Sequence, residues 1–341
     1  MAEKYLVIAD KLELELKKMR AEGRTKLPSE QELAAGFSCS RQTVRASLDV
    51  LCQKGLIEKR KGSGSYLAGT SSYNKTVFFM TEDCDRYQSP ALIAGLKERL
   101  SHAGFTLKSF STGGSIKGEK AVLLRVLSER PAALIIEPVR DLIPNPNLNL
   151  IEEIKGAGIP VIYSNSVLGD VCVLPDNAGG AKSLTNHLLE SGRRNIACVF
   201  RMDDSSGRDR FQGYIDALSD SGADFDESRC LLLIYQEEKD IILCRDKKLA
   251  AFAAGTLAGC DAVICQNGMI AYQLLNLLIK AGRSVPDDIV VACFDNGCYS
   301  SAGLLSAGYD NAAFCKALAG AAVALAEGRS AKSVMVEMLL I

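Results

Sequence analysis

Tryptophan is absent from this 341-residue sequence, histidine occurs only twice, and none of the 12 cysteines belongs to a Cys-x-x-Cys pair. His102 and His187 lie apart from any group of cysteines or carboxylates, which argues against a zinc site or a histidine-based catalytic relay. The cysteine spacings match no metal-binding or redox motif, so we expect buried structural thiols. We expect neither a bound metal nor a cofactor.

Long apolar runs are also missing. No stretch of 18 apolar residues occurs, and the first residues, MAEKYLVIADKLELELKKMR, alternate charged and apolar side chains. We therefore expect no membrane span, no signal peptide, and a cytoplasmic protein with reduced thiols. The sequence lacks a Gly-x-x-x-x-Gly-Lys-Ser/Thr phosphate loop, a nucleophile elbow and a His–carboxylate pair, and these absences weigh against an enzyme.

Charge is distributed unevenly along the chain. The whole sequence has 40 Lys and Arg residues against 41 Asp and Glu, whereas residues 1–70 contain 13 against nine. The length exceeds what one hydrophobic core usually serves, so two or three domains are expected. A basic N-terminal domain beside an acidic remainder directs nucleic acid toward one end of the molecule.

The N-terminal segment has the pattern of a winged helix-turn-helix. Apolar residues spaced three and four apart predict an amphipathic helix over 3–20. Ser29 and Glu32 have the spacing of a capping box, which predicts that a second, short helix begins there. Ser38 or Ser40 begins a third helix. Three helices of this kind, followed by a wing, form a winged helix-turn-helix DNA-binding head.

Potential DNA contacts gather at two places in the head. Arg41, Gln42 and Arg45 lie near the start of the third helix, the end of a recognition helix that enters the major groove. Arginine presents a bidentate fork to guanine or phosphate, and glutamine pairs with adenine. Residues 56–67 predict a two-stranded wing with a basic, glycine-containing tip for the minor groove. The candidate contacts are Gln31, Ser40, Arg41, Gln42, Thr43, Arg45, Arg60, Lys61, Gly62 and Gly64.

The motifs LPSE-x-EL, SR-x-TVR, L-x-x-L-x-x-x-GLI and the G-x-G turn resemble the DNA-binding domain of GntR-family transcription regulators over residues 4–69. An alternative is that the cations only form a solvated surface, but the helix cap, the helix spacing and the wing all occur together. The resemblance implies that operator DNA is contacted by the matching residues, Gln31, Ser40, Arg41, Thr43, Arg45 and Gly64.

From Lys75 onward, short apolar runs alternate with amphipathic segments. Alternating strands and helices predict a parallel sheet covered on both faces, and the strands are too many for one small sheet. We therefore predict an α/β body of two Rossmann-like lobes. The predicted domains are a winged helix-turn-helix head over 1–69, a linker over 70–75 and the two-lobed body over 76–341.

Polar side chains follow the predicted strands of the body. Ligands of open α/β sheets bind beyond the C-terminal ends of the strands, so these residues are candidates for a ligand site. Carboxylates, amides and a guanidinium match a polyol, because each sugar hydroxyl both donates and accepts. Asp and Asn also cap helices and form turns, which is the alternative for each of them. The candidates are Glu82, Glu137, Asp203, Asn165, Asn267 and Asp295 at the strand ends, and Arg210 in the first turns of the helix after the NIACVF strand.

Capping and ligand binding both stay open as interpretations for Glu82 and Glu137. For Asn165, Asn267, Asp295 and Arg210, recurrence at equivalent points of the repeated strand–helix unit favours ligand binding.

The motifs IPVIYSN, PDNAGG, HLLESGRRNIA, RDRFQGY, QNGMIA and VPDDIVVACFD resemble the effector domain of the LacI family over residues 75–341. That family is similar to periplasmic sugar-binding proteins. The resemblance implies a two-lobed, periplasmic-binding-protein-like body whose sugar is held by the residues at Asn165, Arg210, Asn267 and Asp295.

A GntR-type head joined to a LacI-type body implies a homodimeric repressor of sugar-utilisation genes, which a sugar releases from a palindromic operator. The effector expected from this resemblance is L-arabinose. Gly268 and Asn296 depart from the LacI-family pattern, so another pentose, a hexose or a nucleoside stays an alternative. Without tryptophan, stacking on a sugar face falls to tyrosine or phenylalanine, and Tyr87, Phe200 and Tyr235 are the candidates by position.

Two other classes compete with this interpretation. Some GntR-headed proteins carry catalytic bodies, but the missing catalytic motifs argue against an enzyme. A binding protein without a role in gene control is opposed by the expected absence of a signal peptide and by the intact DNA-binding pattern.

Overall fold

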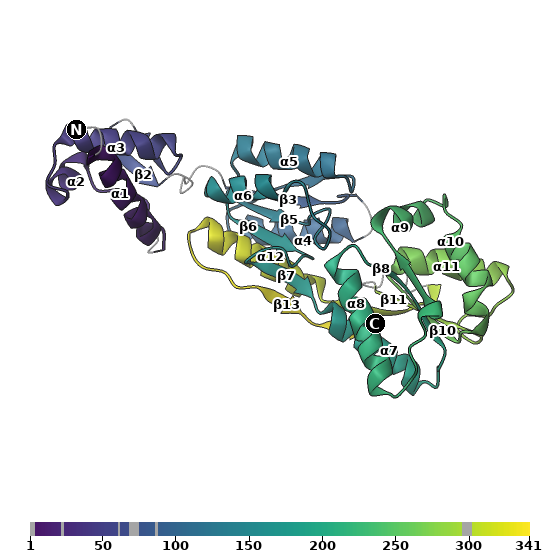
Figure 1. The fold of residues 1–341 in the computed structure, drawn as a ribbon. Helices are drawn as coiled ribbons and strands as arrows, with labels where there is room; N and C mark the ends of the chain where they lie inside the picture. Colours follow the sequence, from purple (N-terminus) through teal and green to yellow (C-terminus); the bar gives the residue numbers. More distant parts are fainter. Residues whose placement is uncertain (1–3, 22–23, 61, 68–74, 86–87, 295–301) are drawn as a thin grey trace.

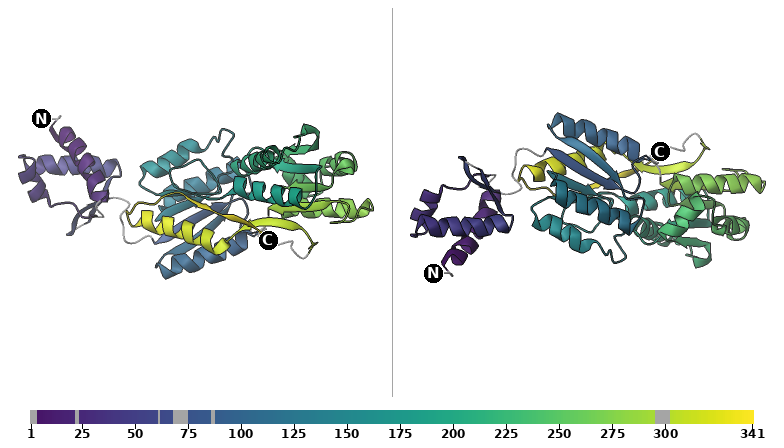
Figure 2. Two further views of the ribbon diagram at one scale, coloured as in Figure 1. Left: turned by 90° about the horizontal axis from the view of Figure 1, so that it is seen from below. Right: turned by 90° about the horizontal axis from the view of Figure 1, so that it is seen from above.

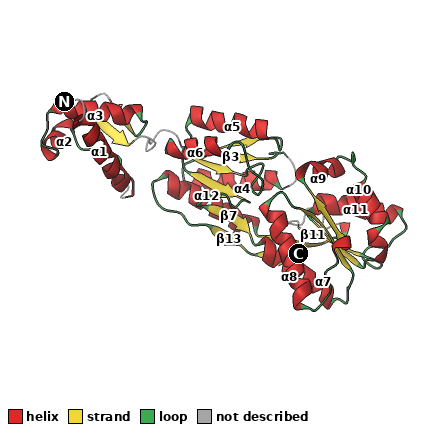
Figure 3. Ribbon diagram, viewed as in Figure 1, coloured by secondary structure: helices red, strands yellow, loops and turns green. Residues whose placement is uncertain are grey.

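The computed structural model describes residues 4–21, 24–60, 62–67, 75–85, 88–294 and 302–341. It contains a helical head with a two-stranded sheet and a body of two α/β lobes (Figures 1 and 3). The head lies beyond the first lobe in all views (Figure 2). The two-domain fold class predicted from the sequence is confirmed. Within the described ranges, no helix is long and apolar enough to span a membrane, and no group of potential metal ligands occurs.

The head consists of three helices and a wing. Ser29 accepts a hydrogen bond from the Glu32 amide, and the Glu32 carboxylate accepts one from the Ser29 amide, so the predicted capping box is confirmed. Ser40 is the N-cap of the third helix. Apolar residues from every element of the head share one core. The elements are α1 (Lys4–Ala21), α2 (Glu30–Gly36), α3 (Arg41–Gln53), β1 (Ile57–Arg60) and β2 (Gly64–Leu67).

The first lobe of the body is a six-stranded parallel sheet with strand order β13-β7-β6-β5-β3-β4. Helices α4 and α12 cover one face, and α5 and α6 cover the other. Its central strands are continuous apolar runs because both faces are buried. The elements are β3 (Thr76–Thr81), α4 (Ser89–His102), β4 (Thr106–Ser111), α5 (Ile116–Glu129), β5 (Ala133–Ile136), α6 (Leu148–Gly156), β6 (Val161–Ser164), β7 (Cys172–Pro175), α12 (Asn311–Ala326) and β13 (Val334–Val336).

The second lobe repeats this architecture with strand order β14-β12-β11-β10-β8-β9, in which only the β14–β12 pair is antiparallel. Helices α7 and α8 cover one face, and α9, α10 and α11 cover the other. The elements are α7 (Asn177–Glu190), β8 (Ile196–Arg201), α8 (Ser205–Asp220), η1 (Glu227–Arg229), β9 (Cys230–Leu233), α9 (Tyr235–Ile242), α10 (Lys248–Ala254), η2 (Thr256–Gly259), β10 (Ala262–Cys265), α11 (Gly268–Lys280), β11 (Val290–Phe294), β12 (Leu305–Tyr309) and β14 (Met338–Leu340).

Three connections join the two lobes. The chain leaves the first lobe after β7, returns to it after β12, and crosses again between β13 and β14. The Asp176 amide donates to the Val336 carbonyl at 2.8 Å, which ties the first crossing to the third. Asp176 and Asp310 then cap α7 and α12 by accepting hydrogen bonds from the amides of Gly179 and Ala312. Short crossings of this kind allow two rigid lobes to rotate about a common hinge.

The described cysteines are free thiols, most of them buried or partly buried. Cys244 is exposed, so the expectation of buried thiols is wrong at that position. It lies in the exposed turn that directly follows α9.

Helices α7 and α8 approach closely at Gly213, where an added Cβ would lie 2.1 Å from the Ala178 carbonyl oxygen. We expect Gly213→Ala to push the helices apart and to lower the free energy of unfolding by about 1 to 3 kcal/mol. Gly320→Ala in α12 is the matched control, because nothing lies within 4 Å of its added Cβ. Alanine favours a helix over glycine by up to about 1 kcal/mol, so this control is neutral or stabilising. Urea denaturation measures both variants, and equal stability of the two would contradict the close packing.

Candidate functional site

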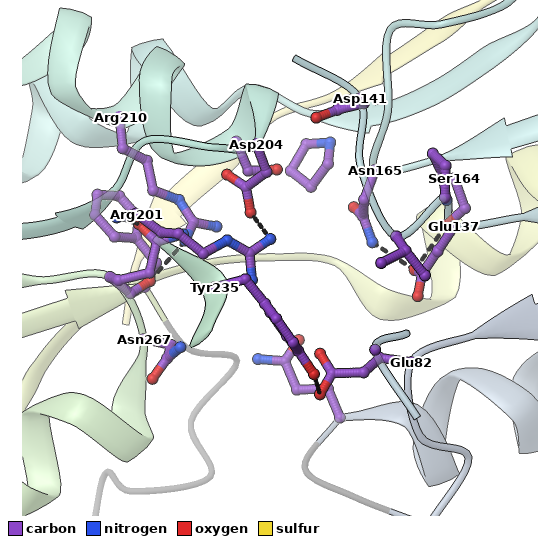
Figure 4. A pocket seen from close by; sticks show the side chains of 18 of the residues that line it. Glu82, Glu137, Asp141, Ser164, Asn165, Arg201, Asp204, Arg210, Tyr235 and Asn267 are labelled. Carbon is purple, nitrogen blue, oxygen red and sulfur yellow. Dashed lines mark hydrogen bonds and ion pairs between the residues drawn. The ribbon is translucent and has the colours of Figure 1, made fainter. Parts of the chain in front are cut away.

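A cavity of about 250 Å³ lies between the two lobes, at the C-terminal ends of their strands (Figure 4). Glu137 and Asn165 reach it from the ends of β5 and β6 in the first lobe. Arg210 of α8 and Asn267, which precedes α11, reach it from the second lobe. The structure thus brings these four predicted ligand-binding residues together. Asp295, the fifth, lies outside the described residues.

Glu137 is the centre of a hydrogen-bond network on the wall formed by the first lobe. Asn165 Nδ2 donates to Glu137 Oε1 at 2.7 Å, and Ser164 Oγ donates to the same oxygen at 3.0 Å. Thr81 Oγ1 donates to Glu137 Oε2. Burial raises the pKa of Glu137, and these three donors offset part of that rise. Asn165 has a φ of 53°, in the left-handed region that asparagine adopts more readily than most residues. Both the backbone and the side chain therefore favour asparagine at this position.

Arg210 lies on the wall formed by the second lobe, where two neighbours fix its guanidinium. Its Nε donates to Asn177 Oδ1 at 2.8 Å, and its Nη1 donates to the Gln266 carbonyl at 2.6 Å. The guanidinium carbon is 4.4 Å from the centre of the Phe294 ring, a cation–π distance. A planar donor group is thus held against an aromatic ring at the cavity wall.

Asn267 both caps a helix and lines the cavity. Its Oδ1 accepts a hydrogen bond from the Ile270 amide at 3.0 Å, which makes it the N-cap of α11. Its Nδ2 donates to Glu238 Oε1 at 2.6 Å. The capping interpretation weighed from the sequence is therefore confirmed for this residue, and its side chain faces the cavity at the same time.

Arg201, the last residue of β8, lines the cavity but is not among the residues that the strand-end rule selects. Three carboxylates surround its guanidinium: Glu238 at 3.1 Å, Asp203 at 3.3 Å, and Asp204. The Arg201 side chain is only 20% exposed, so water screens these ion pairs less than surface pairs. The feature of the sequence that could have identified Arg201 as a cavity residue is its position directly after the apolar run IACVF.

Two hydrogen bonds from α9 cross the cleft to the first lobe. The Tyr235 hydroxyl donates to Glu82 Oε1 at 2.8 Å, and Lys239 Nζ donates to the Gly113 carbonyl at 3.3 Å. Glu82, for which capping and ligand binding were both open, thus lies at the contact between the lobes and also lines the cavity.

Asp141 makes a further contact between the lobes by accepting a hydrogen bond from the Ser205 amide at 3.0 Å. The loop that carries Asp141 is anchored by Glu119, a fully buried carboxylate of α5. A buried carboxylate is tolerated only when hydrogen bonds satisfy it. Glu119 accepts them from Val139 N at 2.8 Å, Asn145 Nδ2 at 2.9 Å and Asn147 Nδ2 at 2.7 Å.

The three aromatic residues proposed from the sequence to stack on a sugar differ in where they lie. Tyr235 lines the cavity. Phe200 is fully buried in the core of the second lobe, so the expectation for Phe200 is wrong, and Tyr87 lies outside the described residues. Alternate residues of a strand face opposite sides of the sheet, and Phe200 faces α7 and α8. Phe294 and Tyr309, at the ends of β11 and β12, line the cavity instead.

On the head, the first turns of α3 present several predicted DNA contacts to solvent. Arg41, Gln42 and Arg45 are exposed. The Thr43 amide donates to Ser40 Oγ at 3.1 Å, and the two hydroxyl oxygens are 2.8 Å apart. The hydroxyls of Ser40 and Thr43 therefore stabilise the start of α3.

The Arg45 guanidinium is oriented by Glu30 of α2. Its Nη2 donates to Glu30 Oε2 at 2.8 Å and its Nε donates to Oε1 at 3.3 Å, a two-pronged contact that lowers the pKa of Glu30. Gln31, beside Glu30, is exposed. Two neighbouring helices thus place Arg45 and Gln31 on the outside of the head.

The wing is tied to the recognition helix by an ion pair between Lys59 and Asp49 of 2.6 Å. Gly62 and Gly64 have φ angles of 76° and 111°, which only glycine adopts without strain, so the tip needs both. Arg60 ends β1 beside this tip, whereas Lys61 lies outside the described residues.

Known protein families match both the head and the body of the chain. Residues 4–67 match the bacterial regulatory proteins of the gntR family, and residues 185–339 match a periplasmic binding protein-like domain. An arabinose metabolism transcriptional repressor of Geobacillus stearothermophilus is 31% identical over 284 residues, covering 81% of this chain and 78% of that protein. A second repressor of that name, from Halalkalibacterium halodurans, is 27% identical over 288 residues, covering 81% and 76%.

Solved structures show the same fold. The transcriptional regulator CelR in complex with cellobiose is 18% identical, with a TM-score of 0.68 over 92% of this chain and 98% of that one. A periplasmic binding protein/LacI transcriptional regulator from Alkaliphilus metalliredigens, in complex with D-xylulofuranose, has a TM-score of 0.67 at 18% identity over 79% and 97% of the two chains.

Fold and relatives together define a DNA-binding transcription repressor, a class of protein without enzymatic activity. The chain belongs to the same family as the two arabinose metabolism transcriptional repressors, with a gntR-type head and a periplasmic binding protein-like body.

If Arg45 reads a base, Arg45→Ala should weaken binding to an operator duplex by about 1 to 3 kcal/mol, because a bidentate contact is lost. Effector binding should be unchanged, since the residue lies in the head. Lys54→Ala is the matched control: Lys54 is an exposed cation, paired with Glu13, that caps the opposite, C-terminal end of the same helix. Fluorescence anisotropy with a duplex selected from a random pool measures both variants. Equal losses for Arg45→Ala and Lys54→Ala would contradict a specific role for Arg45.

Proposed function

We propose that this protein is a cytoplasmic homodimer that represses sugar-utilisation genes and leaves its operator when L-arabinose binds between the lobes. The observation that carries the proposal is the cavity between the lobes, with Glu137, Asn165, Arg210 and Asn267 on its walls. The first two belong to one lobe and the last two to the other. A ligand that contacts both pairs at once stabilises one arrangement of the lobes over others.

The chemistry of these walls supports a sugar. The Glu137 carboxylate has about four acceptor positions, and the side chains of Thr81, Ser164 and Asn165 donate to it, which leaves a position for a sugar hydroxyl. The Arg210 guanidinium supplies fixed donors for ring or hydroxyl oxygens. Amides and carboxylates on facing walls match the paired donor and acceptor character of each hydroxyl.

Size and ring contacts support a monosaccharide. The cavity of about 250 Å³ is smaller than the roughly 300 Å³ at which pockets for drug-sized ligands begin. The Arg210 guanidinium lies over the Phe294 ring. The Arg201 guanidinium and the Lys239 ammonium lie 5.6 and 5.5 Å from the centre of the Tyr235 ring. These rings and cations place apolar surface beside hydrogen-bond donors, as binding of a sugar requires. The two repressors with which this chain shares its family point to L-arabinose among pentoses and hexoses.

Coupling to DNA follows from the hinge. A sugar that binds the closed lobes more tightly than the open ones shifts the population toward closure. In a two-fold symmetric dimer, this movement changes the spacing of the two recognition helices, which must match the half-site spacing of the operator. The head contacts proposed for operator binding are Gln31, Ser40, Arg41, Gln42, Thr43, Arg45, Arg60, Lys61, Gly62 and Gly64.

Thermal unfolding against a panel of pentoses, hexoses and nucleosides tests the effector assignment. L-Arabinose should stabilise the wild-type protein, by about 2.7 kcal/mol at a concentration one hundred times its Kd. Arg210→Ala should lose this stabilisation while keeping operator binding. Arg208→Ala is the matched control, since Arg208 is exposed on the same helix, pairs with Asp209 and does not line the cavity.

If a different sugar raises the melting temperature and Arg210→Ala abolishes that rise, the proposed site stands and the other sugar replaces L-arabinose as the proposed effector. A shift that survives in Arg210→Ala would show that the ligand binds elsewhere. The absence of any shift across the panel in the wild-type protein would overturn the proposed effector class.

A further inference from the structure

Tyr235 stands between two cavities of the cleft. The cavity described above, of about 250 Å³, includes residues near the hinge such as Pro175 and Tyr309. A second cavity of about 210 Å³ lies toward Ser89 and Ile242. Both are lined by Glu82, Glu137, Arg201, Tyr235 and Asn267. The two cavities are therefore neighbours with a shared wall, and Tyr235 is the large aromatic side chain in that wall.

The Tyr235 side chain is held in place from both lobes. Its hydroxyl donates to Glu82 Oε1 at 2.8 Å, while its backbone amide donates to Asp203 Oδ2 at 3.0 Å. Burial and the Glu82 carboxylate raise the pKa of Tyr235, so the hydroxyl stays protonated and continues to donate. The ring thus spans the space between the second lobe, which carries it, and the first lobe, which it contacts (Figure 4).

The first lobe approaches the Tyr235 hydroxyl closely at Gly114. A Cβ added to Gly114 would lie 1.7 Å from the hydroxyl oxygen, and Gly114 has a φ of 64°. The ring is flanked by the Arg201 guanidinium at 5.6 Å and the Lys239 ammonium at 5.5 Å from its centre. With contacts at its tip and cations near its ring, the side chain has little freedom to swing aside.

The second cavity has the chemistry of a sugar subsite. It offers the carboxylates of Glu82, Asp83 and Glu238 as acceptors, and Ser89 and Lys239 as donors. Ile242 and Met269 add apolar surface of the kind that packs against the C–H groups of a sugar ring. The second cavity and the first are similar in volume.

We infer that Tyr235 determines the length of the effector: its ring ends the cavity near the hinge at the size of one sugar unit and excludes disaccharides. The inference rests on the proposed function, because it places a monosaccharide in that first cavity. Removal of the ring joins the two cavities, and a second sugar unit then occupies the space lined by Ser89, Lys239 and Ile242.

Isothermal titration of L-arabinose and of cellobiose, a disaccharide, into the full-length protein tests this inference. The wild-type protein should prefer L-arabinose at least one hundredfold. In Tyr235→Ala this preference should fall at least tenfold, through a gain in cellobiose affinity. Tyr235→Phe removes the hydroxyl but keeps the ring, so its preference should stay that of the wild type even if both affinities fall.

Gln236→Ala is the matched control. Gln236 is the exposed neighbour of Tyr235 on α9, its amide donates to Asp240, and it lines neither cavity. Both affinities should equal those of the wild type. If Tyr235→Ala unfolds at the assay temperature, Tyr235→Leu replaces it, because leucine keeps apolar packing near the backbone but does not reach Glu82.

The outcomes separate this inference from the proposed function. If the wild type binds a monosaccharide while the folded Ala or Leu variants gain no affinity for cellobiose, the role of Tyr235 is overturned and the effector site stands. If the wild type binds cellobiose as well as it binds a monosaccharide, the ring does not exclude disaccharides and the inference is wrong. If the wild type binds no monosaccharide, the proposed function and the inference fail together.

Discussion

The hydrogen bond from the Asp176 amide to the Val336 carbonyl, 2.8 Å long, ties together two of the three places where the chain passes between the lobes. Each lobe has its own sheet and its own two apolar clusters. The cavity, in contrast, belongs to neither lobe alone, since its walls come from both. The position of the lobes about the hinge therefore decides whether Glu137 and Arg210 face the same ligand.

The cleft combines this geometry with buried charge. Arg201 lies among Asp203, Asp204 and Glu238, and burial raises the pKa of Glu137. Charged groups removed from water are stable only when partners satisfy them, so the cleft is costly to form without an internal network. Part of that network crosses between the lobes, as between Tyr235 and Glu82. A polar ligand in the cavity adds to the same set of contacts.

The sequence predicts the head better than the cleft, for a physical reason. Ser29, Glu32 and Ser40 act on backbone groups within three residues of themselves, so their roles are visible in a short stretch of sequence. The rule that ligands bind at strand ends selected Asn165 and Asn267, which line the cavity, because it depends only on where an apolar run stops.

Residues whose role depends on distant partners escaped this reasoning. Glu119 matters because its helix meets a loop some 20 residues later in the chain, and no local pattern marks it. Arg201 and Phe200 are adjacent in one strand and face opposite sides of its sheet, and the sequence does not say which side meets the cleft. Their places follow from the packing of α7 and α8 against one face.

The central claim is that occupancy of the cleft controls the DNA-binding head. The most direct measurement is the affinity of the full-length protein for its operator duplex, by fluorescence anisotropy, with and without saturating L-arabinose. Couplings between sites in allosteric proteins usually change affinity by about 5- to 150-fold, and we expect a loss of operator affinity in that range. L-Arabinose that binds in the cleft and leaves operator affinity unchanged would contradict the account.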